Sequence, residues 1–157
     1  MKRFYKNKLD YINDNIKEND VVLDVGFWGQ GVKMDDKNWP HKLIKNKAKI
    51  VYGLDLDFDE SVFSGNFYKK ANAEDFQFDI KFDVIFAGDL IEHLSNPGLF
   101  LESCKKNLKE GGRILITTPN CFNLFNFSSK ITKREPLSNP DHTCYFNITT
   151  LSQLFKK

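Results

Sequence analysis

The sequence predicts an α/β fold in which a mainly parallel β-sheet is flanked by helices. Apolar segments of strand length alternate along the chain with segments whose apolar residues follow helical spacing. The first of these strands ends in an acid followed by glycines, and the second also ends in an acid. In open parallel sheets, ligands bind outside the carboxyl ends of the strands, so these acids and glycines indicate a ligand-binding edge.

The first half of the chain is expected to hold two helices and two strands. Residues 3–18 place apolar side chains at mostly helical spacing between Lys and Asn residues, which predicts an amphipathic leading helix. Residues 21–25 form an apolar run that is typical of a strand buried on both faces. Pro40 suits the first turn of a helix, which predicts a short helix over residues 40–47. Residues 50–55 are the second strand.

The second half of the chain is assigned on the same grounds. It contains a brief helix at 58–63, strands at 67–71, 82–87 and 113–118, and helices at 97–108 and 148–155. Gly111 and Gly112 are expected to end the helix before the fifth strand, and Asn147 is the expected N-cap of the last helix. Residues 119–141 are rich in Asn, Ser and Phe, and so long a connection inside a compact domain is typical of a functional lid.

Composition limits the class of protein. A chain of 157 residues with 41% hydrophobic content is long enough for one domain and too short for two comfortable ones. Its 23 basic and 21 acidic residues leave a net charge of +2, which gives no strong case for nucleic acid or an anionic membrane as a partner. Cys104, Cys121 and Cys144 lack zinc-site or disulfide spacing and are expected to be free thiols. Without a signal peptide or a membrane-length apolar run, the expected location is cytoplasmic.

The acids at the strand ends indicate which ligand the edge would bind. Asp55 at the end of the second strand suits the two hydroxyl groups of a ribose. Gly26, Gly29 and Gly31 do not have the dinucleotide spacing, and the next helix starts late. Asp24 would repel a pyrophosphate and attract a cation, as in S-adenosylmethionine, which has an ammonium, a sulfonium and no phosphate. Taken singly, each feature is also compatible with an ordinary turn or a solvated acid.

Several segments resemble the class I S-adenosylmethionine-dependent methyltransferases, in particular the small-molecule branch with ubiquinone-biosynthesis-like and glycan-modifying members. The matching segments are 22–26, 51–55, 71–76, 82–94 with 111–120, and 141–146. The resemblance implies a Rossmann-like sheet of about five strands in the order 3-2-1-4-5, without the last two strands of the family. It implies a single domain over residues 1–157, with a leading helix (1–20), a cofactor-binding core (21–118) and a substrate-side loop and helix (119–157).

The resemblance also implies a set of residues that bind S-adenosylmethionine. They are Asp24, Gly26, Phe27, Trp28, Gly29, Asp55, Leu56, Asn72, Ala73, Ala87 and Asp89. Three of them depart from the family pattern, because Phe27 and Trp28 insert bulk into the glycine turn and Asn72 stands where Asp is more common. We expect an active enzyme if Trp28 lines the cofactor pocket and a silent one if it fills the pocket.

The implied reaction is methyl transfer to a small-molecule or sugar-like acceptor, by O- or N-methylation. An in-line displacement needs a base only for a hydroxyl acceptor, and His93 and His142 are the candidates, although His93 also suits a packing role. Asp89, Glu92 and His93 are spaced to share one helical face and could form a metal site completed by His142. Phe122, Phe125 and Phe127 could cap the acceptor pocket.

Two other classes of function compete with the enzyme. A catalytically silent scaffold would bind the nucleoside, or nothing, and would act through the sheet edge. Without the last two strands of the family, the fifth strand would be an apolar edge. Either a second copy or another partner covers this edge, or the chain is truncated. A nicotinamide-dependent oxidoreductase is disfavoured, because the pyrophosphate turn is missing.

Overall fold

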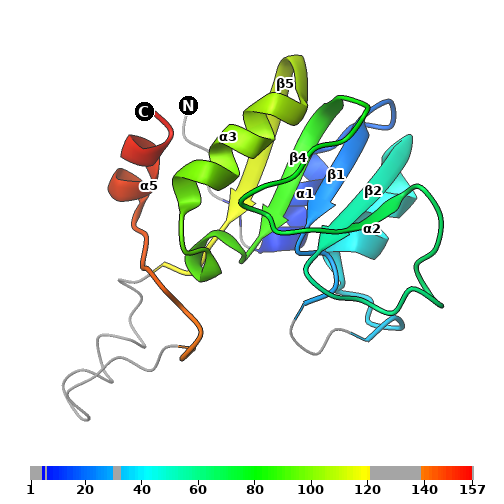
Figure 1. The fold of residues 1–157 in the computed structure, drawn as a ribbon, viewed down its shortest axis with the longest axis horizontal. Coiled ribbons are helices and arrows are strands. Elements are labelled where there is room, and N and C mark those ends of the chain that lie inside the picture. Colours follow the sequence, from blue (N-terminus) through cyan, green and yellow to red (C-terminus); the bar gives the residue numbers. More distant parts are fainter. Residues whose placement is uncertain (1–4, 6, 30–32, 121–138, 157) are drawn as a thin grey trace.

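The computed structural model describes residues 5, 7–29, 33–120 and 139–156, and it contains one parallel sheet (Figure 1). The strand order is β3-β2-β1-β4-β5, which confirms the predicted sheet and its order. The strands are β1 (Val21–Val25), β2 (Ile50–Asp55), β3 (Tyr68–Lys70), β4 (Phe82–Gly88) and β5 (Leu108–Thr117). All of their pairings are parallel, so their carboxyl ends lie at the same edge of the sheet.

Helices lie on both faces of this sheet (Figure 1). They are α1 (Lys8–Asn15), α2 (Pro40–Lys47), α3 (Pro97–Asn107) and α5 (Ile148–Leu154), with a short 3-10 helix, η1 (Ile91–His93). Successive strand residues point to opposite faces: Val22 packs with Ile12 of α1, whereas Leu23 packs with Phe100 of α3. Within the described residues, no helix has the length and apolar character needed to cross a membrane.

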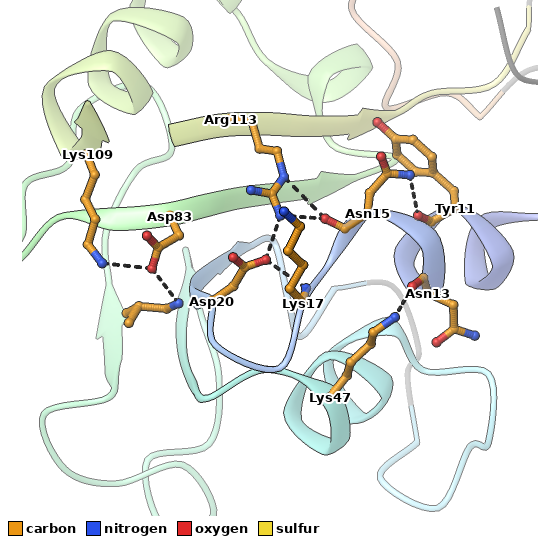
Figure 2. A network of polar contacts seen from close by, with 10 residues as sticks. Tyr11, Asn13, Asn15, Lys17, Asp20, Lys47, Asp83, Lys109 and Arg113 are labelled. Atoms are coloured by element: carbon orange, nitrogen blue, oxygen red, sulfur yellow. Dashed lines mark hydrogen bonds and ion pairs between the residues drawn. The ribbon is translucent and has the colours of Figure 1, made fainter. Parts of the chain in front are cut away.

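Polar contacts hold the amino-terminal ends of the central strands together (Figure 2). An Arg113 Nη of β5 donates to Asp20 Oδ2 at 2.6 Å and to the Asn15 carbonyl oxygen at 2.8 Å. The Asp83 carboxylate accepts from the Val21 N–H and from Lys109 Nζ, both at 2.8 Å. These contacts lie at the edge opposite the acids of β1 and β2, so they fix the sheet and leave the carboxyl edge for binding.

The first residues of α5, α2 and α3 are those that the sequence predicts for helix starts. Asn147 accepts from the N–H groups of Thr149 and Thr150, and the Thr150 hydroxyl accepts in return from the Asn147 N–H. This capping box confirms Asn147 as the N-cap of the last helix. Pro40 and Pro97 occupy the first turns of α2 and α3, where the missing N–H costs nothing.

The predicted helix at 58–63 is wrong. The Asp59 carboxylate accepts from the Ser61 N–H at 2.9 Å, and the segment forms a turn instead of a helix. Phe58 and Phe63 are both buried in a cluster with Phe27 and Trp39. Burial of the two rings and the local hydrogen bonds of Asp59 therefore outweigh the helical spacing.

Several boundaries also differ from the sequence-based expectations. The helix predicted over 3–18 begins at Lys8, because Asn7 is its N-cap and accepts from the Asp10 N–H. Gly111 and Gly112 do not end α3, which stops at Asn107 and passes directly into β5 at Leu108. The positive φ of 73° at Gly111 instead lies inside this irregular start of β5, where the register with β4 shifts.

Candidate functional site

A cavity of about 280 Å³ lies at the carboxyl ends of β1, β2 and β4. It is close to the lower end of the usual range for small-molecule sites, about 300–1,000 Å³. Among the predicted site residues, Asp24, Gly26, Phe27, Gly29, Asp55, Asp89 and His93 line it. Its other lining residues are Lys8, Trp39, Pro40, His41, Phe86, Gly88 and Leu90. Segments far apart in sequence therefore meet at one place. We call it the first cavity.

The glycine turn after β1 gives the cavity its backbone wall. Gly26 has a φ of 75°, which L-residues rarely adopt, and its N–H donates to the Leu54 carbonyl oxygen at 2.7 Å. A Cβ at this position would lie 3.1 Å from Leu90 Cδ1. The turn thus needs a glycine at residue 26 both for its conformation and for its close approach to Leu90.

Asp55 is fixed by the backbone on both carboxylate oxygens. Oδ2 accepts from the Trp28 N–H at 2.9 Å, and Oδ1 accepts from the Leu56 N–H at 2.8 Å. Burial raises the pKa of Asp55, and hydrogen bonds from the backbone N–H groups of Trp28, Asp57 and Leu56 lower it. A carboxylate has about four acceptor sites, so it keeps acceptor capacity with which a ribose diol could be bound without breaking the turn.

Asp24 has a buried partner that sequence reasoning missed. His41 Nδ1 lies 2.9 Å from Asp24 Oδ2, and the two side chains are 0% and 4% exposed respectively. Burial raises the pKa of Asp24, while the hydrogen bond and charge of His41 lower it. His41 comes directly after Pro40 at the start of α2, so the long loop before it ends at the cavity.

Asp89 lies apart from the helical turn that was expected to include it. Its φ of 51° places it outside η1, which begins at Ile91. The carboxylate pairs with Lys8 of α1 and accepts from Thr117 Oγ1 at 3.0 Å. The prediction that Asp89, Glu92 and His93 share one helical face is therefore wrong, because Asp89 has a left-handed backbone conformation and lies before the turn begins.

The two aromatic residues in the glycine turn have different positions. Phe27 is buried and lines the first cavity. Trp28 is not among its described lining residues and packs its ring 5.0 Å from Phe63 and 5.8 Å from Trp39. Trp39 Nε1 in turn donates to the Phe27 carbonyl oxygen at 2.7 Å. Trp28 therefore packs against the aromatic cluster of Phe27, Trp39, Phe58 and Phe63. It neither lines nor fills the described part of the first cavity.

Four other predicted cofactor residues lie outside the described lining of the first cavity. Leu56 is 72% exposed, directly after Asp55. Asn72 is exposed, and its Oδ1 accepts from the Glu74 N–H at 2.9 Å. Ala73 and Ala87 are buried in the core between the sheet and α3. Their roles toward a cofactor stay predictions.

His93 meets His142 and Glu92 at one side of the first cavity. The two imidazole rings are 4.7 Å apart, and ligand atoms of all three side chains lie within 4.8 Å of one another. Glu92 is buried, and among the described residues neither of its carboxylate oxygens has a hydrogen-bond partner. Thr143, the residue after His142, anchors this part of the chain to η1, because its N–H donates to the Glu92 carbonyl oxygen at 2.8 Å.

A second cavity of about 850 Å³ adjoins the first. Its described lining comprises Tyr5, Asn7, Lys8, Tyr11, Asp89, Ile116, Thr117, Thr118, Pro119, Asn120, Phe146, Asn147, Ile148 and Leu151. The Lys8–Asp89 ion pair lines both cavities and marks their boundary. Phe122, Phe125 and Phe127, which were expected to cap an acceptor pocket, lie outside the described residues.

The charges of the first cavity fit a cationic nucleoside. Three carboxylates, those of Asp24, Asp55 and Asp89, face one ammonium group, that of Lys8. An acidic excess at this site favours a ligand with a sulfonium and an ammonium over one with a pyrophosphate. S-adenosylmethionine therefore meets the charge and the ribose requirements of the described residues.

Comparisons with known proteins identify relatives of this chain. A family model described as a methyltransferase domain matches residues 1–157. A ubiquinone biosynthesis O-methyltransferase of Glaesserella parasuis is 33% identical over 132 residues, which cover 72% of this chain and 52% of that protein. The chain thus spans about half the length of this curated relative.

Solved structures share the fold. A candidate methyltransferase of Bacillus halodurans has a TM-score of 0.68 and 19% identity, covering 95% of this chain and 67% of that one. An S-adenosylmethionine-dependent methyltransferase of Clostridium acetobutylicum has a TM-score of 0.57 and 16% identity, covering 82% and 55%. At these identities the structural likeness shows the fold alone.

Proposed function

The chain belongs to the methyltransferase family, whose methyl donor is S-adenosylmethionine, and we propose that it transfers a methyl group from this donor to a small-molecule or sugar-like acceptor. The observation that carries the proposal is the acidic first cavity at the carboxyl ends of β1 and β2. It combines a glycine turn at Gly26 with a ribose-compatible carboxylate at Asp55. A phosphate-bearing cofactor would not suit this arrangement.

Different residues of the first cavity would bind different parts of the methyl donor. Asp55 would accept the ribose hydroxyls, and the backbone from Gly26 to Gly29 would face the amino-acid end. When bound, S-adenosylmethionine supplies a methyl group on a positively charged sulfur, which an acceptor nucleophile can displace. The protein then contributes mainly by holding the acceptor in line and excluding water.

The second cavity is the proposed place of the acceptor. Its boundary with the first cavity is the Lys8–Asp89 pair, so a group bound there would approach the donor across a short distance. Its lining mixes apolar groups such as Leu151 with amide and hydroxyl groups such as Asn120 and Thr117. This mixture suits a small molecule with both an apolar body and hydroxyl groups.

His93 is the proposed base if the acceptor is a hydroxyl. It lines the first cavity and faces His142, which could take the proton onward. An amine acceptor would need no base beyond the loss of its proton to solvent. O-methylation should therefore fall about 10²–10⁴-fold in kcat on His93→Gln, whereas N-methylation should change much less.

A divalent metal at Glu92, His93 and His142 is a second candidate feature, favoured by the buried carboxylate of Glu92, which has no hydrogen-bond partner within the described part of the chain. Glu92 would supply a carboxylate oxygen to such a metal, and His93 and His142 would each supply a ring nitrogen. Calorimetric titration of the chelator-treated protein with Mg²⁺, Mn²⁺ and Zn²⁺ would reveal binding. If none binds, or if Glu92→Gln binds equally well, the metal is eliminated.

Calorimetry with S-adenosylmethionine and S-adenosylhomocysteine tests the proposed function. Both should bind, and Asp55→Ala should weaken them at least about tenfold through loss of charge-assisted hydrogen bonds. Asp57→Ala is the matched control, because Asp57 lies two residues further, is exposed and pairs with Lys70. No binding to the unaltered chain would leave the silent-scaffold hypothesis in its place. NAD should not bind.

A further inference from the structure

We propose that His41 is a positioning residue for the methyl donor, because it holds the Asp24 carboxylate where that group can receive the ammonium of the donor's amino-acid end. The inference rests on the proposed function, since it assumes that S-adenosylmethionine occupies the first cavity. It adds a specific role for a histidine that neither the glycine turn nor the strand-end acids would identify.

The geometry divides the two carboxylate oxygens of Asp24 between protein and ligand. Oδ2 lies 2.9 Å from His41 Nδ1. Among the described residues, no group donates a hydrogen bond to Oδ1. Asp24 is only 3% exposed, and it lines the first cavity. A buried carboxylate with an open acceptor site is suited to bind a positively charged donor group.

A chain of polar contacts runs from Lys45 through Tyr68 and His41 to Asp24. Lys45 Nζ donates to the Tyr68 hydroxyl oxygen at 3.2 Å, and this oxygen lies 3.3 Å from His41 Nε2. In the protonated imidazole, and in the neutral form that carries its hydrogen on Nδ1, the Nδ1 hydrogen points to Asp24. Both nitrogens of His41 therefore have a partner, and Nδ1 faces the carboxylate at the cavity.

Aromatic packing holds the imidazole in this orientation. The His41 ring lies 4.8 Å from Phe27 and 5.2 Å from Trp39, measured between ring centroids. Both aromatic residues are buried, so the ring has little freedom to turn away from Asp24. Phe27 and Trp39 line the same cavity, which means that the aromatic residues around the glycine turn serve to orient His41.

The sheet order shows why this carboxylate would meet the amino-acid end. Asp55 of β2 would hold the ribose, and β1 lies between β2 and β4. A donor bound at Asp55 that delivers its methyl group toward Asp89 must therefore cross the end of β1, where Asp24 stands. The ammonium group is the only cation of the donor besides its sulfonium, and Asp24 supplies the matching charge.

Two ligands that differ only at the amino-acid end isolate this role. S-adenosylhomocysteine has the amino-acid end, and 5′-methylthioadenosine keeps the adenine and ribose but lacks it. For His41→Leu we expect calorimetry to show at least about tenfold weaker binding of S-adenosylhomocysteine. Binding of 5′-methylthioadenosine should stay within about twofold, because its contacts do not involve Asp24.

His41→Asn is the matched control, since its amide nitrogen takes the place of Nδ1 and can still donate to Asp24. It should restore S-adenosylhomocysteine binding to within about threefold of the unaltered chain. A structural role alone would weaken both ligands equally and would not be rescued so selectively. Equal loss for both ligands, or no loss for either, would overturn the proposal.

Tyr68→Phe keeps the test decisive if His41→Leu does not fold. It removes the hydroxyl that contacts Nε2 and keeps the ring that packs on Phe27. We expect about threefold weaker S-adenosylhomocysteine binding and unchanged 5′-methylthioadenosine binding. If the unaltered chain binds neither ligand, the proposed function itself fails. If it binds both and the variants do not discriminate between them, only the role of His41 fails.

Discussion

Asp24 should make donor binding sensitive to pH. Burial raises the pKa of this carboxyl group, against the opposing effects of His41 and Lys8, while the charge of Asp55 raises it further. Binding of an ammonium group needs the ionised form. The affinity for S-adenosylhomocysteine should therefore fall as the pH is lowered, starting above the range in which an ordinary aspartate takes up its proton.

Burial also raises the pKa of Asp55. Comparing S-adenosylhomocysteine with 5′-methylthioadenosine separates the pH effect of Asp24 from that of Asp55. Both ligands contain the ribose, so the ratio of their affinities should depend on Asp24 and not on Asp55. Calorimetry across a pH series measures this ratio, and Asp24→Asn should make it independent of pH in the acidic range. A ratio that is constant in the unaltered chain would contradict the assignment.

Gly53 illustrates a residue whose lack of a side chain matters for packing. A Cβ there would lie 2.7 Å from Tyr68 Cδ1 and 2.8 Å from Phe27 Cδ1. We expect Gly53→Ala to lower the free energy of unfolding by about 1–3 kcal/mol, because the rings must shift. Urea denaturation measures this loss. Gly29→Ala is the control, since no described residue has an atom within 4 Å of its Cβ position, and it should be close to neutral.

Cys104 should be unreactive in the folded protein. It is fully buried, and burial strongly raises the pKa of its thiol, so almost no thiolate forms at neutral pH. In a Cys121→Ser variant, a thiol reagent should label only Cys144 under native conditions and both remaining cysteines in denaturant. Rapid native labelling of Cys104, located by peptide mass spectrometry, would show that the core around α3 opens.

At the residue scale, the sequence was most informative where chemistry follows directly from position in a strand. Asp24, Gly26 and Asp55 line the first cavity because parallel strands bring their carboxyl ends together. Lys8 and His41 could not be found in this way. They come from α1 and α2, and only the packing of these helices on the sheet brings them to the cavity.

At the scale of elements, Asn107 connects the end of α3 to the segment before β4. Its Nδ2 donates to the Phe76 carbonyl oxygen at 3.0 Å, and its Oδ1 accepts from the Phe78 N–H at 2.8 Å. Asn107 is fully buried. We expect Asn107→Ala to cost about 2–4 kcal/mol of unfolding free energy, because buried backbone groups lose their partners.

Ser103→Ala, on the same helix, is the variant with which the cost of Asn107→Ala is compared. The Ser103 hydroxyl makes one hydrogen bond, to the Glu74 carbonyl oxygen at 3.1 Å, so its loss should cost about 1 kcal/mol. Chemical denaturation of both variants gives the two values. Equal costs would mean that the segment before β4 finds other partners when Asn107 is removed.

Strands were predicted better than their connections. Burial on both faces makes a parallel strand an uninterrupted apolar run, which explains why β1, β2 and β4 were located from the sequence. The segment 58–63 was mistaken for a helix because the same phenylalanines that suit a helix face also fill an aromatic cluster. Spacing alone does not distinguish these two uses of a ring.

For the whole molecule, Arg113 joins the far strand of the sheet to the turn before β1 (Figure 2). Its guanidinium meets the largely buried Asp20 carboxylate at 2.6 Å. Arg113→Met should cost about 1–3 kcal/mol in thermal or chemical unfolding, because Asp20 loses a charge-assisted partner. Lys109→Met removes a more exposed pair with Asp83 and should cost less than about 1 kcal/mol. The reverse ranking would contradict this account.

The pairing of Asn120 with Phe146 lets the two cavities change independently of each other. Asn120 and Phe146 form a parallel bridge, and the Thr143 hydroxyl donates to the Leu94 carbonyl oxygen at 2.6 Å. Asn120 and Phe146 both line the second cavity, and neither is among the described lining residues of the first cavity. Substitutions at these two positions would therefore reshape the wall of the second cavity while the described wall of the first cavity keeps its residues.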